Sequence, residues 1–292
     1  MEKNVFMKDF YVPMITPFTK SGGVDYAGIK KAVRHLEARG AEGIYAMGSS
    51  AECFLLTPDE RKKGLEAVID AAGGMQVIAH VGYPSADIAV DFCKHAKSAG
   101  ACGITSVPPF YYRFSFQEIK EYYRILADAV DLPVMLYNIP ATTGVSFSAE
   151  QASELLKDKR IAAMKFTEKD YYTMERIKAA TGVRMYSGAD ECFLSALAAG
   201  ADGAIGSTFN CMLDKFKAIK KFYEAGEMKK ALETQKKANA VIEALIRRNL
   251  YAGIKYLMSL QGLDIEIHGR RPFMPLTEQE KQHIKKVYEE NA

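Results

Sequence analysis

YVPMITP (residues 11–17) is the first of a series of short apolar runs, and it is not followed by the glycine-rich loop of a dinucleotide-binding sheet. Similar runs alternate with amphipathic helical segments over residues 1–225. The expected strands are residues 11–15, 43–47, 77–81, 103–107, 134–138, 162–167, 184–187 and 203–206. Eight strand–helix units in a stretch of this length predict an α/β fold, the TIM (β/α)8 barrel, rather than an open doubly wound sheet.

The helical segments show one buried face and clear starting signals. In residues 25–39 the apolar positions Ile29, Ala32, Val33 and Leu36 follow the i, i+3, i+4, i+7 spacing of an amphipathic helix. The expected capping boxes are Thr57 with Glu60, Ser115 with Glu118, and Ser148 with Gln151. These signals fix the starts of the helices between the strands.

Residues 226–292 are expected to be mostly helical. Their apolar stripe consists of Ala231, Ala238, Val241, Ile242 and Leu245. We therefore expect a catalytic barrel over residues 1–225 and a helical extension over residues 226–292 that packs on the barrel and has no chemistry of its own.

Composition excludes several classes of function. The 292 residues include 39 basic and 36 acidic side chains without long blocks, which argues against nucleic-acid or membrane partners. Residues 1–10 lack the apolar core of a signal peptide, and no apolar run approaches the ~20 residues of a membrane span. The five cysteines are scattered without a CxxC pair, and the histidines show no ligand spacing, so we expect reduced thiols, a cytoplasmic protein and no metal.

Lys165 lies near the end of the apolar run IAAMKFT (residues 161–167). Burial of an amine disfavours its charged form, and a neutral amine attacks carbonyl carbons. The alternative is a lysine at a strand end that extends to solvent. Alternation along the strands places Tyr137 and Lys165 on inward faces of neighbouring strands about 4.8 Å apart, so a phenol and an amine can meet in the barrel mouth.

Polar turns follow several other strands. Ser49 and Ser50 lie in a turn whose amides and hydroxyls can hold a carboxylate, or can simply cap a helix. Asp190 and Glu191 could bind a polyol or could likewise act as caps. The glycines at 200, 203 and 206 are more typical of close packing than of a phosphate site.

Six motifs in order along the chain resemble one known family. They are GSSAE (48–52), PFYYRFSF (109–116), YNIP (137–140), Lys165 on its strand, GADE (188–191) and IGSTFN (205–210). Together they resemble the N-acetylneuraminate lyase and dihydrodipicolinate synthase family. The resemblance implies a class I aldolase barrel, usually a homotetramer, that uses no external cofactor.

The resemblance also implies roles for individual residues. Lys165 would form a Schiff base with pyruvate or a pyruvate-derived acid, and Tyr137 would shuttle protons. Tyr111 would complete a relay across a subunit contact, and the turn of Ser49 and Ser50 would hold the substrate carboxylate.

The two branches of the family differ after the fifth strand. The synthase branch has an arginine two residues after the proline, where this chain has Thr142, which cannot bind a carboxylate as a guanidinium does. The residues that resemble the lyase branch's wall for a sialic acid are Thr167, Gly188, Asp190, Glu191 and Ser207. Two positions depart from the family pattern, because Ala51 replaces the usual glycine and Thr142 replaces an apolar residue.

The expected reaction is cleavage of N-acetylneuraminate to pyruvate and N-acetylmannosamine. Alternatives within the family are a 2-keto-3-deoxy sugar acid aldolase or dehydratase and dihydrodipicolinate synthase. A binding-only alternative is a 2-keto acid sensor, which would have no need of a reactive lysine; a phosphate-binding isomerase is more distant. His80 is expected to be a core residue, and His268 has no expected catalytic role.

Overall fold

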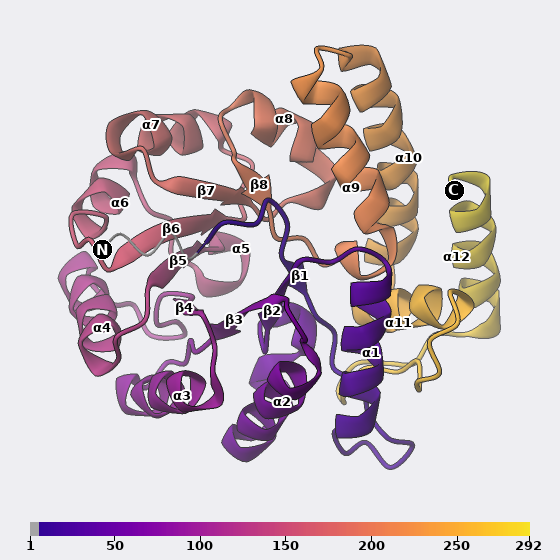
Figure 1. The fold of residues 1–292 in the computed structure, drawn as a ribbon, viewed down its shortest axis with the longest axis horizontal. Helices are drawn as coiled ribbons and strands as arrows, with labels where there is room; N and C mark the ends of the chain where they lie inside the picture. The colour runs from indigo at the N-terminus through magenta and orange to yellow at the C-terminus, as the bar shows by residue number, and fades with distance from the viewer. Residues whose placement is uncertain (1–5) are drawn as a thin grey trace.

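A single sheet of eight parallel strands forms the centre of the molecule (Figure 1). The structure is a computed structural model that describes residues 6–292; residues 1–5 of the predicted barrel segment lie outside the described part. The strands follow one another in chain order. They are β1 (Val12–Pro13), β2 (Gly43–Ala46), β3 (Gln76–His80), β4 (Gly103–Ser106), β5 (Val134–Asn138), β6 (Ile161–Phe166), β7 (Arg184–Ser187) and β8 (Gly203–Ala204).

Helices surround the sheet, as Figure 1 shows. Those of the barrel are α1 (Tyr26–Ala38), α2 (Pro58–Ala71), α3 (Ala86–Ala99), α4 (Phe116–Ala129), α5 (Pro140–Thr143), α6 (Ala149–Leu155), α7 (Tyr171–Thr181), α8 (Phe193–Ala198) and α9 (Phe209–Glu224). The extension contains α10 (Met228–Ile246), α11 (Leu250–Leu260) and α12 (Glu278–Glu290). Short 3₁₀ helices are η1 (Ser49–Ala51), η2 (Cys53–Leu55) and η3 (Asp190–Cys192).

The sheet closes into a barrel between its first and last strands. The Tyr11 N–H donates to the Ala204 carbonyl at 3.2 Å, and the Ala204 N–H donates to the Asp9 carbonyl at 2.8 Å. Glycine is required at position 203, because a Cβ there would lie 2.0 Å from the Asp9 carbonyl oxygen. The predicted TIM barrel is therefore confirmed, and the packing explanation holds for this glycine.

The end strands are shorter than the sequence predicts. Residues 11–15 and 203–206 were expected to be strands, but β1 and β8 have two residues each. Pro13 has no N–H to donate, and its carbonyl accepts from the Asn210 side chain at 2.9 Å instead of from a strand. The Ile15 N–H likewise donates to the Asn210 side-chain oxygen at 3.4 Å. An asparagine of α9 thus replaces part of the ladder.

The predicted helix signals are confirmed. Asp25 caps α1, and its carboxylate accepts from the Gly28 N–H at 2.8 Å. The four predicted apolar positions of this helix are buried. The three predicted capping boxes are present, at Thr57, Ser115 and Ser148. A fourth, at Thr277, starts α12.

The core has two parts. One lies between the strands and the surrounding helices, and the apolar stripe predicted for α10 belongs to it. The other fills the barrel and is rich in aromatic side chains, with Tyr11, Tyr45, Met135, Tyr137, Ala163 and Tyr186 among its members. In residues 6–292 no helix is both long and apolar enough to cross a bilayer.

Candidate active site

Lys165 is buried inside the barrel, with 5% of its surface exposed. The register of β5 against β6 places it directly beside Tyr137. Its Nζ lies 4.1 Å from the centroid of the Tyr137 ring and 4.7 Å from that of Tyr45. The structure thus brings the predicted amine and phenol together, in a largely apolar setting.

Aromatic rings and a histidine complete the surroundings of the amine. Tyr45 packs edge-on against Tyr137, with ring centroids 6.1 Å apart, and burial raises the pKa of the Tyr45 hydroxyl well above its usual value. His80 is buried beside both rings. Burial, with Arg61 and Lys165 nearby, holds the pKa of His80 well below its ordinary range, which favours the neutral imidazole. His80 is a core residue, as predicted, but its ring also lies beside Tyr45 and Tyr137, the two rings that contact the Lys165 amine.

The turn of Ser49 and Ser50 forms η1 at the end of β2. The Ser50 hydroxyl is buried and shares a hydrogen bond of 2.6 Å with the Ser207 hydroxyl, which links the loops after β2 and β8. Ala51 is fully buried, and its carbonyl accepts from the Thr16 hydroxyl at 2.8 Å. The methyl group that departs from the family pattern therefore packs in the core.

Gly188, after β7, allows a close approach of two strand ends. A Cβ at this position would lie 1.9 Å from Thr167 Oγ1 and 3.1 Å from Lys165 Cε. Thr167 Oγ1 is buried and has no hydrogen-bond partner within residues 6–292. A buried hydroxyl without a partner beside the amine is available to a ligand.

Asp190 has mainly a structural contact in this structure. Its Oδ2 accepts from the Thr208 N–H at 2.9 Å and from the Thr208 hydroxyl at 2.7 Å, at the start of α9. A Cβ at Gly206 would lie 1.8 Å from the other oxygen. Burial raises the pKa of Asp190 to about 6, although the Thr208 hydrogen bonds oppose the shift. Oδ2 therefore contacts the residue that precedes α9, which is not the helix that directly follows Asp190 in the chain.

Glu191 and Tyr111 lie toward solvent. The Glu191 carboxylate forms an ion pair with Lys169 at 3.0 Å. Tyr111 is 85% exposed, and its φ of 80° lies in the left-handed region that is unfavourable for a tyrosine. Its ring packs edge-on against that of Tyr112, which is also exposed, with ring centroids 5.1 Å apart. The single chain therefore does not bring Tyr111 to Lys165.

A largely apolar pocket of about 260 Å³ adjoins the barrel mouth. Ser49 and Thr142 line it from the barrel, and Tyr251, Pro272 and Phe273 line it from the extension. Burial raises the pKa of the Tyr251 hydroxyl to about 12. A search restricted to strand ends misses these residues of the extension, and it also missed Tyr45, which alternation along β2 could have placed inside the barrel.

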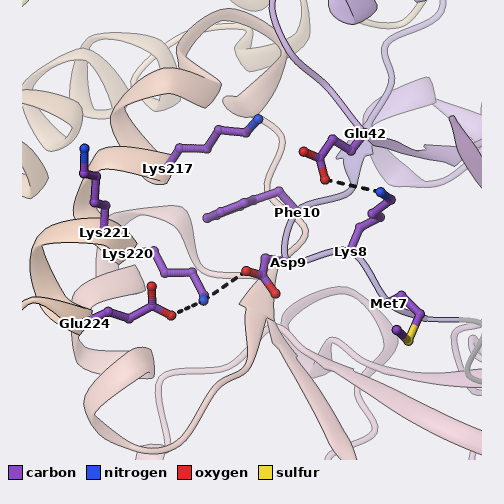
Figure 2. A pocket seen from close by; sticks show the side chains of 9 residues that line it. All are labelled: Met7, Lys8, Asp9, Phe10, Glu42, Lys217, Lys220, Lys221 and Glu224. Carbon is purple, nitrogen blue, oxygen red and sulfur yellow. Dashed lines mark hydrogen bonds and ion pairs between the residues drawn. The ribbon is translucent and has the colours of Figure 1, made fainter.

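A second hollow, of about 490 Å³, lies at the opposite end of the barrel (Figure 2). Several of its charges are paired: Lys220 contacts Asp9 at 3.0 Å as well as Glu224, and Lys8 contacts Glu42 at 3.5 Å. Lys217 instead donates to the Gly40 carbonyl at 2.6 Å. This end of a TIM barrel serves stability, whereas chemistry takes place at the carboxyl ends of the strands. Across residues 6–292, no group of three or more His, Cys, Asp or Glu side chains could hold a metal.

The chain is similar to known proteins over almost its whole length. The model of the dihydrodipicolinate synthetase family matches residues 7–291. N-acetylneuraminate lyase 2 of Escherichia coli O6:H1 is 40% identical over 94% of this chain and 91% of its own length. N-acetylneuraminate lyase of Clostridium perfringens strain SM101 is 36% identical over 96% of this chain and 98% of its own.

A solved structure is similar over nearly the whole chain. CdNal from Clostridium difficile, in complex with mannosamine, superposes with a TM-score of 0.95 at 34% identity and covers 98% of this chain and 99% of its own. The family model and these relatives span both the barrel and the extension. The chain belongs to the dihydrodipicolinate synthetase family.

Proposed function

We propose that this protein is a Schiff-base aldolase, a carbon–carbon lyase that cleaves N-acetylneuraminate reversibly to pyruvate and N-acetylmannosamine. The observation that carries the proposal is the buried Lys165 amine, 4.1 Å from the Tyr137 ring centroid at the carboxyl end of β6. The names of its relatives supply the substrate class. The buried amine also favours an enzyme over a 2-keto acid sensor, because simple binding needs no buried amine.

The proposed reaction begins with attack of the neutral Lys165 amine on the C2 ketone. Tyr137 gives its proton to the hydroxyl of the carbinolamine, which leaves as water, and a protonated imine remains. The Tyr137 phenolate then takes the proton of the C4 hydroxyl. As the C3–C4 bond breaks, its electron pair moves through C3 to the imine nitrogen, which gives an enamine and the aldehyde.

The enzyme is then restored by the same two groups. Tyr137 protonates C3 of the enamine, which regenerates a protonated imine, now of pyruvate. Tyr137 takes a proton from water, whose hydroxide adds to C2, and collapse of the carbinolamine releases pyruvate and the free Lys165 amine. No external cofactor enters this sequence.

Other residues are proposed to bind the substrate. The first N–H groups of η1 and the hydroxyl of Ser49 are proposed to hold the substrate carboxylate, because the opening amides of a helical turn have no acceptor within it. Thr167, with its buried hydroxyl free of partners in residues 6–292, is proposed to bind the sugar chain together with Gly188, Asp190, Glu191 and Ser207.

The remaining predictions concern assembly and location. We propose a homotetramer in which the exposed ring of Tyr111 is covered by a second copy of the chain and completes the proton relay. The cytoplasmic location stays a prediction. Size-exclusion chromatography with light scattering tests the first point, and Tyr111→Phe should lower kcat without dissociating the assembly.

The test of the proposed function is pyruvate release from N-acetylneuraminate, coupled to NADH oxidation. Wild-type protein should release pyruvate, Lys165→Ala should release none, and the matched control Lys221→Ala, at the opposite end of the barrel, should behave as wild type. Borohydride reduction with pyruvate should give an adduct on Lys165. An adduct without cleavage of N-acetylneuraminate would favour the second candidate, a 2-keto-3-deoxy sugar acid aldolase, since Thr142 departs from the family pattern in the pocket.

A further inference from the structure

A fully buried ion pair joins the extension to the turn after β2. The carboxylate of Glu52 and the ammonium of Lys255 are 2.8 Å apart, and neither side chain has exposed surface. The partners are separated by 203 positions in the chain. Because removal of two charges from water costs about as much as their attraction returns, such a pair is weak evidence for stability alone.

On the barrel side, the ion pair fixes Glu52, the residue that ends the turn of Ser49 and Ser50. Glu52 follows η1 directly, and its backbone N–H donates to the Ser49 carbonyl at 2.9 Å. Its φ of 57° is in the left-handed region, which is costly for a residue with a side chain. Such a conformation persists only where surrounding contacts hold it. The carboxylate of the same residue supplies those contacts.

At the other end, the extension satisfies both carboxylate oxygens. Lys255 donates to Oε1 and also to the His268 carbonyl at 2.9 Å, while the Arg270 N–H donates to Oε2 at 2.7 Å. Lys255 lies four positions after Tyr251 on α11, so both project from one side of the helix. The same helix therefore holds the turn and presents Tyr251 to the pocket that Ser49 also lines.

We propose that Glu52 and Lys255 are positioning residues for substrate binding. The buried pair holds the turn of Ser49 and Ser50 in position. When C2 of a 2-keto acid lies at Lys165, the amides and hydroxyl of this turn can then donate to the carboxylate of the same acid. This inference rests on the proposed function, because it assumes that a keto acid binds there. It gives the extension a part in the site, which the sequence did not predict.

The test measures keto-acid binding apart from turnover. Borohydride trapping at graded pyruvate concentrations gives the half-saturating concentration for the adduct on Lys165. Lys255→Met, which keeps an unbranched side chain one atom shorter and removes its charge, should raise that concentration at least tenfold. The fraction trapped at saturation should change less, because Lys165 itself is untouched.

Two further variants separate positioning from stability. Glu52→Gln with Lys255→Met removes both charges, so it avoids an unpaired buried ion and should unfold at a higher temperature than Lys255→Met alone. Its half-saturating concentration should remain raised, because the charged contact that fixes the turn is still missing. Lys220→Met breaks ion pairs at the far end of the barrel and serves as the destabilised control, with unchanged half-saturation.

The outcomes are distinct. The inference is overturned if the half-saturating pyruvate concentration of the folded double variant stays within twofold of the wild-type value. It is also overturned if Lys220→Met raises that concentration by the same factor as Lys255→Met. Absence of any adduct in wild-type protein would instead reject the proposed function. A wild-type adduct with normal half-saturation in both Lys255 variants would reject the positioning role and leave the function intact.

Discussion

Gly188→Ala tests most directly how closely the strand ends are packed around the reactive amine. The added methyl group would lie 1.9 Å from Thr167 Oγ1, 2.9 Å from Thr167 Cβ and 3.1 Å from Lys165 Cε. Real Cβ contacts below 3.0 Å are essentially absent, so the neighbouring strand end or the loop must move by about 1 Å. A misplacement of this size at a reacting group costs about 100-fold in rate.

The expected loss is therefore about 100-fold in kcat/KM, or about 2.7 kcal/mol of transition-state stabilisation. Overpacking should also lower the free energy of unfolding by about 1–3 kcal/mol. The rate assay is pyruvate release from N-acetylneuraminate, and urea unfolding measures the stability. Gly74→Ala is the matched control, because a Cβ there meets nothing within 4 Å.

A double variant identifies the path of the effect. If the new methyl group acts through Thr167, then Gly188→Ala combined with Thr167→Ala should be little worse than Thr167→Ala alone, since the closest contact has been removed. The reasoning fails if Gly188→Ala retains activity within threefold of wild type. It also fails if the loss of activity in the double variant equals the product of the losses in the two single variants.

Three further predictions concern stability. Asp190, with its pKa raised to about 6 by burial, penalises the folded state once it is charged. Relative to Asp190→Asn, wild type should therefore lose about 3 kcal/mol of unfolding free energy as pH rises from about 3 to 7 in urea titrations. Glu60 behaves in the opposite way, because its hydrogen bonds with Arg270 lower its pKa to about 2. Its contribution to the free energy of unfolding is complete above pH 4.5 and is lost as pH falls toward 2. Acid unfolding of Glu60→Gln, followed in urea titrations, should therefore lack this loss of stability. A double-mutant cycle of Ser50→Ala and Ser207→Ala should give a coupling energy of about 1 kcal/mol in thermal unfolding, and additive effects would refute the link between their loops.

The barrel could be predicted because its signals are local. A strand buried on both faces is an apolar run, and β5 and β7 occur at the predicted residues. Capping depends on residues three positions apart, so the helix starts were also accessible. The length of β1 was not, because Asn210, far along the chain, forms hydrogen bonds with Pro13 and Ile15.

The site was predictable only in part, for a related reason. Alternation along two neighbouring strands placed Lys165 on the same inward face as Tyr137, and the two are paired in the structure although the register of β5 against β6 shifts between Val134 and Met135. The contribution of the extension was missed, because no local pattern near Tyr251 or Phe273 shows that they reach the barrel mouth. The contact of Asp190 with Thr208 likewise joins two loops whose relative position depends on the closed barrel.

Contacts between loops, rather than within them, determine how this site is organised. Ser50 binds Ser207 across the barrel mouth, and Gly188 lets Thr167 approach at a distance that no larger residue permits. Loops linked in this way hold their hydrogen-bond donors in place before the substrate arrives, so little conformational entropy is lost on binding. It follows that an added methyl group at such a junction should impair catalysis more than the loss of one hydrogen bond, because the methyl group displaces two loops whereas the lost bond leaves both nearly in position.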